Sequence, residues 1–259
     1  MRLKFLFFFI FFNAIYSQNN IYFEKIDKVK IDKNYKLINI DNFNNKYFQR
    51  GNQISKEKKL TFSDLSLGNI SSIDLNDPMK IKIWYSDYNN LIVLDNYLNE
   101  ITRINFNDIL LANNISHIST ANDNNVWVFD EIDMKIKKFD FFNRVFIDNV
   151  ETKIDGTLID FQSNYNYLWV LTDQFFYKIN YNGSIIYRSE NNYRFSKISL
   201  FRNDIILLKN NQLVHFKNGD EIFVNIIHEK LFIKDFSVIN ETLYIYDEDY
   251  LNKYLILTY

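Results

Sequence analysis

Acidic residues follow an aromatic segment at several places in this chain, and such carboxylates could act as general acids or bases. The segment NNVWVFD, residues 124–130, ends in one of them. The similarly placed residues are Asp87, Asp130, Asp173 and Asp247, with Asn210 in an equivalent position. A catalytic acid has no reason to recur in this way, whereas Asp and Asn side chains fix turns by accepting hydrogen bonds from nearby backbone amides. We therefore predict that these residues form turns and are not catalysts.

The other residue types that carry chemistry do not form a recognisable set. The chain has no cysteine, and its histidines, His117, His215 and His228, lack metal-ligand spacing. Motifs of nucleophile elbows, phosphate loops, dinucleotide sites and zinc proteases do not occur. The remaining acidic clusters are predicted to be solvated turns, namely Asp130 with Glu131, Asp220 with Glu221, and Asp247 to Asp249. We predict no catalytic, cofactor-binding or metal-ligating residue, and no cofactor.

The three tryptophans could stack on a ligand, because aromatic rings bind flat apolar faces. However, Trp84, Trp127 and Trp169 are each flanked by Ile, Val or Leu in a strongly apolar segment. Large aromatic side chains in such surroundings are usually buried. We predict that all three belong to the core.

A repeat of about forty residues positions these features along the chain. One place in each unit, which we call the slot, holds Tyr47, Trp84, Trp127, Trp169, Ile206 and Tyr244 in turn. A short strand is expected before the slot strand and two more strands after it, with polar turns between them. The slot strands are apolar on both faces, as residues 126–129 show, which indicates cover on both sides. Four antiparallel strands per repeat are typical of a β-propeller blade.

Six units fit the chain, so we predict an all-β fold of six four-stranded blades. Five blades with an irregular start are the alternative, because the first unit contains the charged segment Lys56 to Leu60. The last unit ends after its third strand, and the segment Ile21 to Ile31 precedes the first unit without a partner there. We predict that this segment closes the ring as the outermost strand of the last blade, which protects two strand edges.

The first residues have the pattern of an export signal. A basic start is followed by the apolar run Phe5 to Phe12 and by Ser17, after which cleavage is expected. The run is shorter than the roughly 20 residues that span a bilayer, and no later segment is long enough. We expect a signal peptide at residues 1–17 and one exported domain at residues 18–259 without a transmembrane span. An uncleaved N-terminal anchor is the alternative.

Composition and charge place limits on the partners. Of the 259 residues, 47% are hydrophobic and 18% are aromatic, which is ample for a packed core. The net charge of -2 arises from 30 basic and 32 acidic residues scattered along the chain. Because no basic stripe stands out, we expect no nucleic-acid partner.

The segment Leu67 to Phe106, together with ANDNNVWVFD at residues 121–130, resembles a family of exported proteins of flavobacteria and other Bacteroidota that have no assigned activity. The resemblance implies a propeller-like fold and a location in the cell envelope, either in the periplasm or associated with the outer membrane. It transfers no catalytic residue.

The function remains open between different classes. The first hypothesis is a non-enzymatic platform for another envelope protein, because propellers expose loops on two broad faces. The second is an enzyme or small-ligand binder similar to six-bladed lactonases, in which the central channel gathers acids and amides around a metal or a sugar. Asp74, Asp160 and Asp235, in or beside first strands, are the carboxylates available for it. Carbohydrate binding at the outer surface is a third option.

Overall fold

The computed structural model describes residues 21–31, 36–109, 114–217, 220–224, 232–247 and 249–258. The predicted signal peptide and its cleavage site lie outside this range. In the described part of the chain, no helix is both long and apolar enough to cross a membrane.

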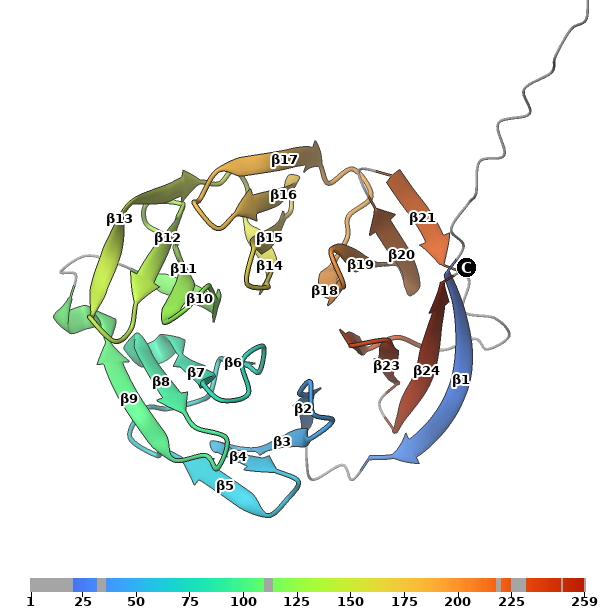
Figure 1. Cartoon of the computed structure of the whole chain (residues 1–259), viewed down its shortest axis with the longest axis horizontal. Coiled ribbons are helices and arrows are strands. Elements are labelled where there is room, and N and C mark those ends of the chain that lie inside the picture. Colours follow the sequence, from blue (N-terminus) through green and yellow to red (C-terminus); the bar gives the residue numbers. More distant parts are fainter. Residues whose placement is uncertain are drawn as a thin grey trace, which may run out of the picture.

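Six antiparallel sheets of four strands each stand in a ring (Figure 1). Blades 1 and 2 contain β2 (Lys36–Ile40), β3 (Lys46–Arg50), β4 (Gln53–Lys56) and β5 (Leu60–Ser63), then β6 (Ser72–Asp74), β7 (Ile81–Tyr85), β8 (Asn90–Leu94) and β9 (Glu100–Asn105). Blades 3 and 4 contain β10 (Ile115–Thr120), β11 (Asn125–Asp130), β12 (Lys135–Asp140) and β13 (Val145–Lys153), then β14 (Leu158–Ser163), β15 (Tyr167–Thr172), β16 (Phe175–Asn180) and β17 (Ile185–Glu190).

Blade 5 contains β18 (Lys197–Phe201), β19 (Asp204–Lys209), β20 (Gln212–Lys217) and β21 (Asp220–Val224). Blade 6 contains β22 (Asp235–Ile239), β23 (Thr242–Tyr246), β24 (Tyr250–Thr258) and β1 (Ile21–Lys30). Two short 3-10 helices, η1 (Ser86–Tyr88) and η2 (Phe106–Asp108), follow β7 and β9. The predicted six-bladed propeller is confirmed, and the five-bladed alternative is wrong because β2 to β5 form a complete sheet around the turn at residues 57–59.

The first strand of each blade lies nearest the axis and the fourth lies outside (Figure 1). Neighbouring strands are antiparallel, so the turns between first and second strands share one end of the propeller with the turns between third and fourth strands. We call this end the 1–2 face and the opposite end the 2–3 face.

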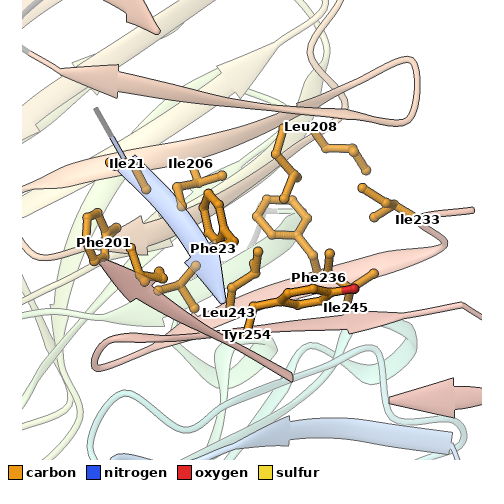
Figure 2. Packing of buried hydrophobic residues seen from close by; sticks show 13 residues of the cluster. Ile21, Phe23, Phe201, Ile206, Leu208, Ile233, Phe236, Leu243, Ile245 and Tyr254 are labelled. Atoms are coloured by element: carbon orange, nitrogen blue, oxygen red, sulfur yellow. The ribbon is translucent and has the colours of Figure 1, made fainter. Parts of the chain in front are cut away.

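The N-terminal strand closes the ring as predicted. β1 pairs with β24 in antiparallel register, from Ile21 opposite Thr258 to Lys30 opposite Tyr250. Figure 2 shows Ile21 and Phe23 inserted between blade 5, represented by Ile206, and blade 6. β1 therefore fills the joint between two blades as well as covering a strand edge.

A β-bulge allows β1 to serve both sides of its blade. The register with β24 shifts between Lys25 and Asp27, and the intervening Ile26 is exposed. An extra residue inverts the alternation of side chains. Ile31 therefore packs on the side opposite to Phe23, with Ile40 of blade 1 and Tyr244 of blade 6.

Each slot residue packs against the following blade. Trp84, Trp127 and Trp169 are between 0% and 3% exposed, so the prediction that they belong to the core is confirmed. Trp84 clusters with Val126 of blade 3, and Trp127 clusters with Leu168 of blade 4. The sequence therefore repeats about every forty residues because each blade must supply a large side chain to the joint with the next blade.

Candidate functional site

The inner-strand acids fasten neighbouring blades together. Asp160 of β14 accepts hydrogen bonds through Oδ2 from the backbone N–H of Ile198 in β18 (2.7 Å) and through Oδ1 from that of Phe161 (2.8 Å). Burial raises the pKa of Asp160, against the effect of these hydrogen bonds. Both oxygens of Asp160 therefore accept from backbone amides, and the bond from Ile198 links blades 4 and 5.

The same arrangement recurs around the axis. Asp74 Oδ2 accepts from the backbone N–H of Thr120 in blade 3 (2.5 Å), and Ser199 Oγ accepts from that of Val238 in blade 6 (2.8 Å). Asp235 forms an ion pair with a lysine of the neighbouring first strand. The three acids available for an enzyme are therefore engaged separately between different blades.

The recurring residues lie at the ends of the second strands or just after them. Asp130 is the last residue of β11, and the connections to the third strands hold Asp87, Asp173, Asn210 and Asp247. Asp130 Oδ1 accepts from the backbone N–H of Ile132 (3.1 Å), and Asp247 Oδ1 accepts from that of Tyr250 (2.9 Å). Asp173 instead accepts from a backbone amide just before β14 (2.6 Å). Asp87 lies in η1, and Asn210 has left-handed backbone geometry, with a φ of 45°. The turn interpretation therefore holds by position. Of these carboxylates, Asp130 and Asp247 accept hydrogen bonds within their own turn, and Asp173 does not.

Asp130 contradicts the prediction of a solvated acidic pair. It is 2% exposed, and its Oδ2 lies 2.9 Å from Nζ of Lys137 in β12, which also reaches Asp133 (2.8 Å). Lys137 comes from the neighbouring strand, and its ammonium group is the partner that water would otherwise provide for the carboxylate of Asp130. Asp220 and Glu221 were also predicted in a turn, but they belong to β21.

Replacing Asp130 with alanine should lower the free energy of unfolding by about 3 kcal/mol, because Lys137 would be left buried with only Asp133 to balance it. Urea unfolding measures the change. Adding Lys137→Met to the same protein removes the orphaned charge and should restore part of the loss. A change below about 0.5 kcal/mol for the single variant, as at ordinary surface positions, would contradict the importance of this pair.

The two histidines in the described part of the chain lie in strands of different blades. His117 of β10 has Nδ1 2.9 Å from Ser116 Oγ, and burial lowers its pKa. His215 of β20 is buried with Nε2 3.2 Å from Asp204 Oδ2. His228 lies outside the described residues. Among the residues that are described, no three His, Cys, Asp or Glu side chains come close enough together to hold a metal ion.

A second repeated feature was missed from the sequence. Lysines of the third strands stack on the slot residues of the second strands, with Lys138 Nζ 4.6 Å from the ring centroid of Trp127 and Lys178 Nζ 4.2 Å from that of Trp169. The register places each pair directly opposite one another. These cation–π contacts stabilise the blades and explain why lysines occur in the third strands, next to buried aromatic residues.

A cavity of about 670 Å³ opens at the 1–2 face, and we call it the hollow. Turns between first and second strands of all six blades contribute to its lining. One lining residue from each blade, in chain order, is Asn42, Asp77, Asp123, Tyr165, Arg202 and Glu241. Its size is within the range of ligand pockets, about 300–1,000 Å³.

Polar side chains of different blades are connected around the hollow. The Tyr165 hydroxyl donates to Asp123 Oδ1 (3.1 Å), and Asn240 Nδ2 donates to the backbone carbonyl of Asn42 (3.3 Å). Arg202 of blade 5 forms an ion pair with a glutamate of blade 6. The mouth of the hollow is therefore preorganised by contacts between blades.

Large apolar side chains project from the turns of the same face. Phe43, Met79, Tyr97 and Phe142 are 69%, 54%, 64% and 54% exposed. Each lies two residues after an aspartate whose Oδ1 accepts its backbone N–H, at 2.8 to 3.0 Å. We call these four residues the turn anchors. The aspartate caps fix the turn backbone at each anchor, whose side chain faces solvent.

The sequence contains a signal for the turn anchors that the prediction did not use. The aspartates, Asp41, Asp77, Asp95 and Asp140, are each followed at the second position by a large apolar residue. Attention to acids after slot strands led instead to the turns of the opposite face. The hollow itself had no comparable signal, because its lining comes from turns far apart in the chain.

Fold and site together define a six-bladed β-propeller with a hollow at one end of its axis. The chain matches no protein-family model, and no curated protein matches it in sequence.

Several solved propeller structures are similar to the chain. One is virginiamycin B lyase from Staphylococcus aureus, with a TM-score of 0.63 and 14% identity over 86% of this chain and 80% of that one. Another is the Pan2 WD40 domain of Neurospora crassa, with a TM-score of 0.59 and 8% identity over 88% and 74%. A third is BBS1N in complex with ARL6DN, with a TM-score of 0.61 and 8% identity over 85% and 77%. At such low identities the similarity establishes the fold alone.

Proposed function

We propose that the protein is a non-enzymatic propeller that binds another protein through its 1–2 face. The observation that carries this proposal is the set of four turn anchors on that face, each held by an aspartate cap. Aromatic residues and Met are enriched at protein interfaces. Rigid presentation lowers the entropy lost on binding.

The cell envelope is the proposed location of this activity, and the partner is proposed to be another envelope protein. The basic and apolar N-terminal pattern supports export, and the resemblance to exported proteins of Bacteroidota agrees with it. Among the similar structures, BBS1N is recorded in complex with ARL6DN, so this kind of fold can serve protein association. The lyase among them is an enzyme by name. We do not extend its chemistry to this chain, whose inner acids are engaged between blades.

The proposal is tested by capture from envelope extracts of the organism that produces the protein. Serine at all four turn anchors should reduce recovery of a stoichiometric partner at least about tenfold, since interface anchors each contribute about 2 kcal/mol or more. The matched control places serine at Tyr88 and Ile132, which are also at least half exposed but belong to the 2–3 face. Equal recovery with both variants, or no stoichiometric partner at several salt concentrations, would overturn the proposal.

A further inference from the structure

We propose that the hollow binds a neutral carbohydrate, with the ring of Tyr165 as the stacking surface. This inference uses the hollow and none of the turn anchors, so it stands independently of the proposed protein partner. It rests on the fixation of one exposed ring, on the hydrogen-bonding groups around it and on the partners that the charged groups of the lining already have.

Tyr165 is held rigidly although its ring faces solvent. It lies in the turn between β14 and β15, where Asn164 Oδ1 accepts from the backbone N–H groups of Asn166 (2.9 Å) and Tyr167 (2.8 Å). Its hydroxyl donates to Asp123 Oδ1 of blade 3 (3.1 Å), and the side chain is 62% exposed. A ring fixed at both ends offers its apolar face at a small entropic cost. The apolar face of a pyranose ring is a suitable partner for it.

The lining offers both donors and acceptors for hydroxyl groups. Three asparagines line the hollow, Asn42 from blade 1, Asn76 from blade 2 and Asn240 from blade 6. Asn240 and Asn76 use their Nδ2 groups to donate to backbone carbonyls, which leaves their Oδ1 atoms as acceptors. A carboxamide can donate and accept, as a sugar hydroxyl can. Apolar lining from Leu200 and Val238 complements the C–H faces of a sugar.

The charged groups that line the hollow already have partners within the protein. Arg202 is paired with Glu241. Asp77 Oδ1 accepts the backbone N–H of Met79 (3.0 Å), and Asp123 Oδ1 accepts the hydroxyl of Tyr165 (3.1 Å). An ionic ligand would compete with these existing partners and lose its own hydration. A neutral ligand with many hydroxyl groups avoids that cost.

Neutral trisaccharides provide the test. Maltotriose, cellotriose and tri-N-acetylchitotriose are titrated into the purified protein and followed by saturation-transfer NMR and calorimetry. At least one should bind, and Tyr165→Ala should weaken it at least about tenfold. Tyr97→Ala is the matched control, because Tyr97 is 64% exposed on the same face but outside the lining of the hollow. Asp123→Ala leaves the ring in place but unfixed and should give an intermediate loss.

The outcomes separate the proposal from its rivals and from folding defects. Tyr165 is largely exposed, so its alanine variant should retain the wild-type melting temperature. No binding by any trisaccharide, or equal binding by the Tyr165 and Tyr97 variants, would overturn the inference. Competition between the bound sugar and partner capture is the result expected for a glycan carried by the partner. Binding without competition is the result expected for a free sugar. Loss of capture through the turn anchors tests only the proposed protein partner.

Discussion

A protein lacking residues 18–31 is expected to melt at least about 10 °C below the full domain. For a domain of this size, each kcal/mol of lost stability lowers the melting temperature by about 2–4 °C. Ile21, Phe23 and Ile31 are all buried, and burial of such side chains contributes about 1.5–3 kcal/mol each. Deletion would also expose the apolar surface that these residues cover and the free edge of β24.

Point variants distinguish this closure from a general effect of truncation. Phe23→Ala removes a ring inserted between blades 5 and 6 and should destabilise the protein by about 3 kcal/mol. Ile26→Ser changes the exposed residue at the bulge and should alter stability by less than about 0.5 kcal/mol. Differential scanning calorimetry provides both comparisons. Unchanged melting after deletion of residues 18–31 would show that β1 does not close the ring in solution.

The spacing of the slot residues led to the prediction of six blades, with five blades left as the alternative. Trp84, Trp127 and Trp169 each fill a joint with the next blade, and every joint needs a large apolar side chain at the same height. A repeated physical requirement leaves a repeated sequence pattern. The closing strand followed from counting strands, since the last unit lacked a fourth.

Features that depend on a single local exception were not predictable in the same way. Ile21, Phe23, Val29 and Ile31 are separated by even numbers of residues, so a regular strand would place them on one face. The bulge at Ile26 inverts that pattern halfway, and alternation cannot reveal an inserted residue. The burial of Asp130 had a similar cause, because it depends on a lysine reaching it from the next strand.

The candidate site was the least predictable part because propeller faces are built from turns. The turns between first and second strands differ in length and composition, as residues 75–80 of blade 2 and residues 164–166 of blade 4 illustrate. No packing requirement makes them repeat. Their side chains meet only through closure of the ring, which brings Asn42 beside Asn240.

Truncation of Trp84 to alanine is expected to destabilise the protein by about 3–5 kcal/mol. Its side chain is fully buried, packs edge to face on Phe106 with centroids 5.8 Å apart, and fills the joint between blades 2 and 3. Its Nε1 also donates to the backbone carbonyl of Ser116 in blade 3 (3.2 Å). The residue therefore links two blades by packing and by a hydrogen bond.

Phenylalanine substitutions separate the two contributions. Trp84→Phe keeps an aromatic ring but leaves the carbonyl of Ser116 without this donor, and an unsatisfied buried group costs about 1–3 kcal/mol. Trp169 occupies the same slot one blade beyond Trp127, but its buried Nε1 has no hydrogen-bond partner among the described residues. Trp169→Phe removes that unpaired group and should be milder than Trp84→Phe by at least about 1 kcal/mol. Urea unfolding of the two variants measures the difference. Equal losses would mean that the indole hydrogen bond of Trp84 adds nothing measurable to the contribution of its packing.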